Sequence, residues 1–298
     1  MPFRSILLAA AVLTAPMPAW AQATPEIDPP PFKAPRIVLI GDSTTAVQSG
    51  WGPSFCGKHV TSLVACINLA RGGRSTSSYR LEGSWTLALY EIKSGGFSDT
   101  YVLVQFGHND QPGKPGRSTD LATEFPANLK RYVEEVRAAG GKPVLVTPLT
   151  RRQFKDGKLI DDLGPWAQAT RKVAAETRTP LVDLHALSTA AVQAMGPVEA
   201  MRLAQSPPDA RVRDAARSGT TIEARFYEPA IPGATVPPPP PPVATPPVQN
   251  NAAAEPMGTP KQAFDYTHLG HEGADYVSAL VATALADAVP ALRRQLLP

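Results

Sequence analysis

Four short stretches of the chain carry residue types that could together cleave an ester. Ser43 lies in "GDST", and Asn109 lies in "GHND". Asp265 and His268 stand three residues apart near the C-terminal end. A serine hydroxyl becomes nucleophilic when a neutral imidazole accepts its proton and a carboxylate fixes the imidazole tautomer. Taken alone, the last pair could be a capping aspartate beside a surface histidine, but with the other two stretches it predicts a triad of Ser43, His268 and Asp265.

The fourth stretch is a glycine-rich turn, "RGGRSTSSY", that contains Gly73. Attack on an acyl carbonyl creates an oxyanion, which fixed N–H donors must stabilise. The main-chain N–H groups of Ser43 and Gly73 and the side-chain amide of Asn109 are the candidate donors. Each of these residues alone could serve only as a cap or a turn residue. Their occurrence after three consecutive predicted strands favours a shared role.

The elements that must position these residues are a set of buried strands separated by helices. Short apolar, β-branched runs predict strands at 36–40, 64–70, 101–106, 143–148 and 180–184. Helices are predicted at 53–63, 84–94, 120–140, 164–178, about 186–204 and about 272–294. This alternation predicts a mainly parallel sheet with helices on both faces. The carboxyl ends of the first three strands share one edge of such a sheet, where ligands bind at the topological switch point.

These blocks, in this order, resemble the SGNH (GDSL-type) hydrolase superfamily. Within it the chain looks like the rhamnogalacturonan acetylesterase family of carbohydrate esterases, through "GDST", "GRS" preceded by a glycine, "GHND" and the D-x-x-H spacing. "WG" after the serine turn and "GHEGA" after the histidine add to the resemblance, which covers roughly 36–205 and 262–290. It implies an α/β fold that is flavodoxin-like, with three α/β/α layers and a five-stranded parallel sheet.

The resemblance also implies an activity, the hydrolysis of O-acetyl esters on a polysaccharide of the rhamnogalacturonan or pectin type, without a metal or organic cofactor. It assigns Ser43 as the nucleophile, Gly73 and Asn109 as oxyanion donors, and Asp265 and His268 as the acid and base. Two alternatives remain open on the sequence. One is a lipase or thioesterase of the same superfamily acting on longer acyl esters, and the other is a non-catalytic carbohydrate-binding protein on the same scaffold.

Residues beside the glycine turn are candidates for contact with the sugar, namely Arg74, Ser75 and Tyr79. Arg74 could equally be a structural ion-pair partner. Cys56 and Cys66 could form a disulfide in an exported protein, or could be two buried thiols. The sequence contains no Cys/His cluster with metal-ligand spacing.

The N-terminus predicts export. Arg4 precedes an apolar run that ends in a small-x-small pattern, Ala19-Trp20-Ala21, which indicates a signal peptide over 1–21 and a periplasmic or secreted protein. The remaining 22–298 is predicted to be a single domain without another apolar stretch that could anchor it in a membrane. A formal net charge of +3, scattered along the chain, does not favour a nucleic-acid partner.

One segment interrupts the predicted domain. Residues 206–262 lack sustained periodicity, and twelve of the 33 prolines fall between 229 and 260. Six of them are consecutive, which favours extended backbone that buries no core. The sequence therefore predicts a disordered or loosely tethered insertion over 206–262.

Overall fold

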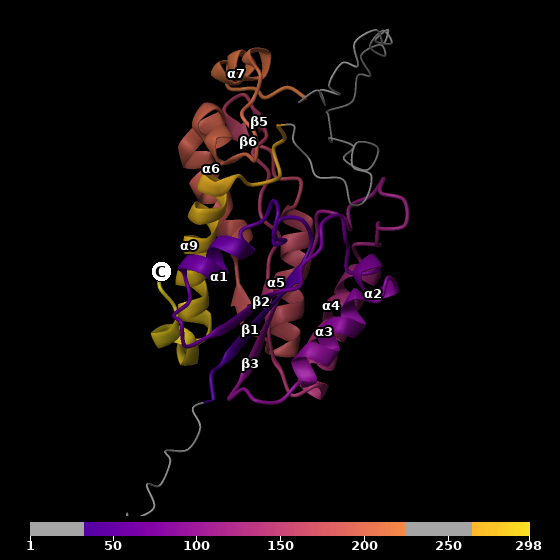
Figure 1. Ribbon diagram of the computed structural model, residues 1–298. Helices are drawn as coiled ribbons and strands as arrows, with labels where there is room; N and C mark the ends of the chain where they lie inside the picture. The colour runs from indigo at the N-terminus through magenta and orange to yellow at the C-terminus, as the bar shows by residue number, and fades with distance from the viewer. Residues whose placement is uncertain (1–32, 224–263) are drawn as a thin grey trace, which may run out of the picture. The chain divides into compact units, whose positions relative to one another are not determined.

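The computed structural model describes residues 33–223 and 264–298 (Figure 1). The predicted signal peptide and residues 224–262 of the predicted insertion lie outside this part of the chain. Within it, no helix combines the length and the apolar character needed to cross a membrane.

A parallel sheet of five strands has the order β2-β1-β3-β4-β7. All five strands occur at the predicted runs, with ends that differ by at most two residues: β1 (Arg36–Gly41), β2 (Ala65–Asn68), β3 (Thr100–Gln105), β4 (Lys142–Val146) and β7 (Leu181–Val182). From β1 the chain passes outward to β2 and then returns to the other side of β1 as β3, with Val38 opposite both Ile67 and Val102. The order of the strands thus reverses between β1 and β3. In a sheet of this kind the ligand site is expected beyond the carboxyl ends of these two strands.

Helices cover both faces of the sheet. One face packs against α1 (Gly52–Lys58), α6 (Leu184–Glu199) and α9 (His271–Ala288), and the other against α2 (Ser78–Leu81), α3 (Ser84–Lys93), α4 (Glu124–Ala138) and α5 (Gly164–Thr177). Ile37 and Leu39 face the first group, whereas Val38 and Ile40 face the second, as the alternation of side chains in a strand requires. Figure 1 shows α1 and α9 on one side of the strands and α3 and α4 on the other. The predicted three-layer α/β/α fold is confirmed.

Several helix boundaries differ from the predicted ones. Helix α1 ends at Lys58 and not at 63, and α4 begins at Glu124, after a turn in which Asp120 Oδ1 accepts hydrogen bonds from two main-chain N–H groups. Gly196, with a φ of 74°, kinks α6 before the short helix η1 (Ala200–Leu203). The last helix stops at Ala288, ahead of Pro290, and a 3₁₀ segment, η2 (Pro290–Gln295), follows.

The predicted start of the insertion is wrong, because residues 206–223 are part of the fold. They contain helix α7 (Ala210–Arg217), whose Val212 and Ala216 pack against Phe264 and Tyr266. The Asp209 carboxylate accepts a hydrogen bond from the Val212 N–H (2.8 Å) and so caps the helix. Eight residues with only two buried positions are too few to give a periodic signal. A small hairpin, β5 (Phe154–Lys155) and β6 (Lys158–Leu159), also lies outside the predicted elements.

The sulfur atoms of Cys56 and Cys66 are bonded in the structure, at 2.00 Å. The bond joins α1 to β2, and both cysteines pack against the core between the sheet and the helices α1, α6 and α9.

Candidate active site

The nucleophile candidate lies in a turn at the carboxyl end of β1. Residues 42–50 form turns and α1 begins only at Gly52, so Ser43 does not lie at a helix N-terminus. The turn is fastened to the neighbouring strand, because Gln105 Oε1 accepts hydrogen bonds from Thr45 Oγ1 (2.5 Å) and Trp51 Nε1 (2.7 Å). A Cβ at Gly41 would stand 2.8 Å from the Gln105 carbonyl oxygen, so only glycine fits where the turn leaves the sheet.

The structure brings Ser43, His268 and Asp265 into one continuous line of contacts. Ser43 Oγ lies 2.8 Å from His268 Nε2, and His268 Nδ1 lies 2.8 Å from Asp265 Oδ2. The other carboxylate oxygen, Oδ1, accepts the main-chain N–H groups of Thr267 and His268, both at 2.7 Å. All three triad candidates are at most 8 % exposed. This is the arrangement that activates a serine hydroxyl, with the carboxylate holding the imidazole in the required tautomer.

One further hydrogen bond ties the serine turn to the loop that carries the histidine, and a second braces the turn itself, although Ser43 and His268 are 225 residues apart. The Leu269 N–H donates to the Ser49 carbonyl (2.9 Å), and Ser49 Oγ donates to the Ser43 carbonyl (3.0 Å). The Oγ–Nε2 contact therefore rests on main-chain anchoring on both sides, which restricts how far the two groups can separate.

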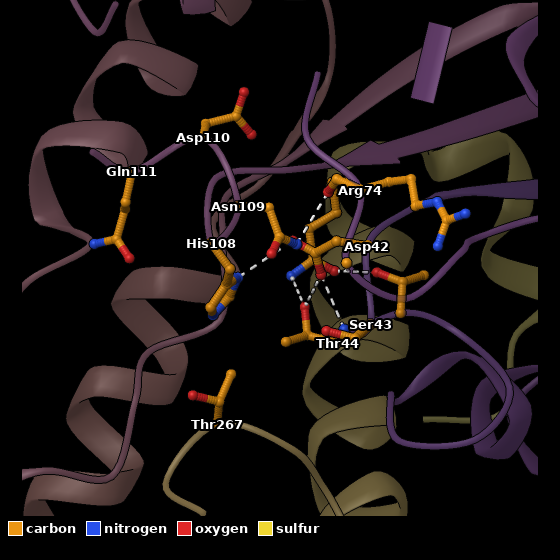
Figure 2. A network of polar contacts seen from close by, with 12 residues as sticks. Asp42, Ser43, Thr44, Arg74, His108, Asn109, Asp110, Gln111 and Thr267 are labelled. Carbon is orange, nitrogen blue, oxygen red and sulfur yellow. Dashed lines mark hydrogen bonds and ion pairs between the residues drawn. The ribbon is translucent and has the colours of Figure 1, made fainter. Parts of the chain in front are cut away.

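The two other oxyanion candidates lie beside Ser43. A Cβ at Gly72 would lie 3.6 Å from the Ser43 Cβ, so the glycine turn packs directly on the nucleophile, and Gly73 has a φ of 79° that favours glycine. The Asn109 amide donates to the Arg74 carbonyl (3.1 Å), a contact visible in Figure 2, and has a second N–H. Arg117 Nη1 lies 3.3 Å from Asn109 Oδ1 and 3.4 Å from the Gly73 carbonyl oxygen, which fixes the orientation of the amide.

A buried pair next to Ser43 was not predicted from the sequence. Asp42 Oδ2 lies 3.4 Å from His108 Nδ1, and Thr44 donates its N–H (2.9 Å) and its hydroxyl (2.8 Å) to Asp42 Oδ1 (Figure 2). His108 is 2 % exposed, and burial lowers its pKa, which favours the neutral imidazole. The pair links the turn after β1 to the stretch after β3. The sequence held a clue to this pair, because the histidine of "GHND" has no role in the predicted triad.

A second buried carboxyl, Asp110, links the glycine turn to the same stretch. It accepts hydrogen bonds from the Thr76 N–H (3.1 Å) and from Thr119 Oγ1 (2.9 Å), and it is 0 % exposed. Burial raises its pKa to about 7, although the hydroxyl and N–H donors act in the opposite direction. Asp110 thereby holds the loop of Gly73 against the loop of Asn109.

The structure does not support sugar contacts by two of the three residues predicted for that role. Ser75 and Tyr79 are 0 % exposed, and the Tyr79 hydroxyl donates to the Leu69 carbonyl (2.8 Å). Arg74 is 9 % exposed, and its guanidinium forms an ion pair with Glu82 (2.7 Å), which is the structural role left open for it. The side chains after the glycine turn point into the protein because they hold the turn in place.

The described residues thus converge on chemistry that uses protein side chains. No group of three or more His, Cys, Asp or Glu side chains in 33–223 and 264–298 could hold a metal ion. The contacts instead combine a hydroxyl next to an imidazole with N–H donors nearby, which is a set suited to acyl transfer.

Comparison with known proteins agrees with this geometry. The profile of the GDSL-like Lipase/Acylhydrolase family matches residues 39–197, slightly more than half of the chain. The chain belongs to this family. The match includes Ser43, Gly73 and Asn109 and ends before Asp265 and His268.

Two relatives from Bacillus subtilis (strain 168) are similar in sequence. The probable rhamnogalacturonan acetylesterase YesY is 35% identical over 158 residues, covering 51% of this chain and 70% of its own. The rhamnogalacturonan acetylesterase RhgT is 36% identical over 176 residues, covering 56% of this chain and 72% of its own. The crystal structure of protein YxiM, also from Bacillus subtilis, superposes with a TM-score of 0.55 at 21% identity, over 86% of this chain and 57% of that one. The protein is a carboxylic ester hydrolase with homology to rhamnogalacturonan acetylesterases, and the predicted resemblance is confirmed.

Proposed function

We propose that this ester hydrolase removes acetyl groups from a polysaccharide, with Ser43 as the nucleophile, His268 as the base and Asp265 as its carboxylate. The observation that carries the proposal is the line of contacts from Ser43 Oγ through the imidazole to the carboxylate, with both steps at 2.8 Å. The Gly72-Gly73 turn packs on the Ser43 side chain, and the Asn109 amide donates to the Arg74 carbonyl that follows this turn, so these groups are the candidate donors to an acyl carbonyl oxygen.

The reaction follows from these positions. His268 Nε2 takes the Ser43 proton as Oγ bonds to the acetyl carbonyl carbon, and the π electrons of the carbonyl move to its oxygen. The oxyanion accepts hydrogen bonds from the Ser43 and Gly73 N–H groups and from Asn109. When the tetrahedral intermediate collapses, the C–O bond to the sugar breaks and the imidazolium protonates the sugar oxygen. Water then repeats the same steps on the acetyl-enzyme and releases acetate.

For the substrate we propose acetylated rhamnogalacturonan or another pectin-type polymer. The support is the similarity to the rhamnogalacturonan acetylesterase RhgT and the probable rhamnogalacturonan acetylesterase YesY, which are 36% and 35% identical to this chain over the aligned residues. We further propose that the protein is exported through a signal peptide over 1–21, which would bring it to a polymer outside the cytoplasm. That proposal rests on the sequence alone.

The test is acetate release from a panel of acetylated pectic, xylan, mannan and bacterial exopolysaccharides. We expect the pectic substrate to give the highest kcat/KM. A parallel series of p-nitrophenyl esters, from acetate to octanoate, distinguishes an acetylesterase from a lipase or thioesterase. A rate that rises with acyl length would contradict the acetylesterase proposal.

Ser43→Ala is the matched control for this panel. It should abolish release of acetate while changing the free energy of unfolding by about 1 kcal/mol or less, since the change removes one hydroxyl from a turn held by other contacts. Residual turnover of a few per cent in a clean preparation would contradict the assignment of the nucleophile.

A further inference from the structure

Arg152 lies in the segment that follows β4 and is 1 % exposed. Its guanidinium donates to the main-chain carbonyls of Asp265 (3.1 Å), Thr267 (3.3 Å) and His268 (2.8 Å). Its main-chain N–H donates to the remaining carbonyl of that turn, Tyr266 O (3.0 Å). One residue therefore binds all four carbonyl groups of the turn that carries the triad aspartate and histidine.

We propose that Arg152 is a positioning residue for ester hydrolysis, which sets the distance and angle between the Asp265 carboxylate and the His268 imidazole. The proposal rests on the function proposed above. In the proposed mechanism Arg152 touches no reacting atom, because the contacts given above are all to main-chain carbonyl oxygens.

Two sets of hydrogen bonds hold the turn. Asp265 Oδ1 accepts the main-chain N–H groups of Thr267 and His268. The Arg152 guanidinium accepts no hydrogen bonds and supplies donors in a fixed plane, which three carbonyl groups must match. Rotation of any of these peptide groups would break a bond to the carboxylate or to the guanidinium. The 2.8 Å contact between Nδ1 and Oδ2 depends on this geometry.

The burial of Arg152 argues against simple space filling. Burial lowers the pKa of its guanidinium to about 10, while the nearby Asp265 carboxylate opposes that change. A buried charge is retained at low energy only where hydrogen bonds compensate its lost hydration. An apolar side chain could fill the same volume but could bind none of the three carbonyls.

The decisive variant is Arg152→Lys, which keeps the charge and loses the planar fork. We expect kcat on p-nitrophenyl acetate to fall about 30-fold with KM within about threefold of wild type, because small misplacements in a catalytic group cost up to about 10²-fold. The rate of Ser43 labelling by a fluorophosphonate should fall in parallel. The acid limb of the pH–kcat/KM profile should move to lower pH, because a looser carboxylate contact stabilises the imidazolium less.

Arg36→Lys is the matched control. Arg36 is also 0 % exposed and also donates to two main-chain carbonyls, of Ile92 (2.9 Å) and Ser94 (3.2 Å), but it begins β1 at the opposite end of the strand from Ser43. This variant should lower the thermal unfolding temperature without changing kcat, the labelling rate or the pH profile of the folded enzyme.

Each outcome decides the proposal. Folded Arg152→Lys with wild-type kcat, labelling rate and pH profile overturns it, as does an equal loss of kcat in Arg36→Lys. If Arg152→Lys does not fold, Arg152→Gln, which keeps an amide donor, takes its place. If neither Arg152 variant folds while Arg36→Lys does, Arg152 is needed for folding only and the proposal is overturned. A wild-type enzyme that neither cleaves the ester nor reacts with the probe would instead overturn the function proposed for Ser43.

Discussion

His268 and His271 lie three residues apart, but their surroundings in the structure differ. His268 is 5 % exposed between Ser43 and Asp265, whereas His271 is an exposed residue that begins α9. A protonated imidazole at a helix N-terminus meets the positive end of the helix dipole, which opposes the charge that a general base acquires.

We therefore expect His268→Ala to lower kcat on p-nitrophenyl acetate by about 10⁴-fold or more, as loss of a triad member does elsewhere. His271→Ala should lower it by about tenfold or less. The two variants are measured side by side, with unfolding temperatures as the control for folding. A larger loss in His271→Ala would mean that the triad is wrongly drawn.

Asp110 makes the stability of the protein depend on pH. Burial raises its pKa from 3.8 to about 7, so between these values the folded protein keeps a proton that the unfolded chain has released. Stability from this group is full at low pH and is lost as pH rises towards 7. Between pH 5 and pH 8 the wild type should lose about 2–3 kcal/mol through this group.

Asp110→Asn removes the titration and keeps Oδ1, which accepts from Thr76 and Thr119. The variant should show a flatter change in the urea midpoint between pH 5 and pH 8 than the wild type. Asp214→Asn, which changes an exposed carboxylate on α7, should leave the wild-type change intact. Equal pH dependence in wild type and Asp110→Asn would show that Asp110 is ionised throughout this range.

At the scale of elements, the sequence predicts strands better than helix boundaries. All five strands were predicted because each lies in a short apolar run, and the central strands β1 and β3 are buried throughout. Helix ends depend on local contacts that composition does not reveal. One example is the turn at Asp120, after which α4 begins at Glu124 and not at the predicted residue 120. Helix α7 was missed because its packing partners, Phe264 and Tyr266, are some fifty residues away in the chain.

The candidate site was predictable only where chemistry imposes residue type and spacing. Ser43, Asp265 and His268 stand out because few other combinations make a nucleophile. Arg152 and Asp110 act through burial and through contacts to distant main-chain or hydroxyl groups, which the sequence does not display. For the same reason the polar residues after the glycine turn looked accessible, although Ser75 and Tyr79 are buried.

The bond between Cys56 and Cys66 is a testable feature of α1 and β2. It closes a loop with a sequence separation of 10, for which chain entropy predicts a stabilisation of about 2–3 kcal/mol. The double variant Cys56→Ala/Cys66→Ala should lose about this much free energy of unfolding in urea and keep its kcat. Alkylation of the wild type under denaturing, non-reducing conditions should modify neither cysteine. Two alkylated thiols by mass spectrometry would show that the bond does not form.

At the scale of the whole molecule, the site joins the two ends of the described chain. Ser43 follows the first strand and His268 precedes the last helix, and the Leu269–Ser49 hydrogen bond closes this long-range contact. Residues 264–298 therefore fold together with 33–223, although 224–263 separate them in sequence, and α9 supplies part of the core on one face of the sheet. In the proposed mechanism they also supply the base and its carboxylate.

The flanks of that intervening segment lie close together, which makes its deletion informative. The Tyr266 hydroxyl donates to the Ile222 carbonyl (2.7 Å), so a short connection can join the two sides. Removing 229–258 would leave ten residues between 223 and 264, enough to span about 30 Å when extended.

We expect the variant that lacks 229–258 to fold and to keep kcat on p-nitrophenyl acetate within about threefold of wild type, because the contacts that join Ser43, His268 and Asp265 to one another lie within 33–223 and 264–298. Unfolding temperature and fluorophosphonate labelling of Ser43 provide the control for an intact site. Acetate release from the polymer is measured on the same preparation, and a loss confined to the polymer would assign the segment to polysaccharide binding. If the variant folds but neither cleaves the ester nor reacts with the fluorophosphonate at Ser43, the prediction is wrong. Part of the catalytic site would then lie within 229–258.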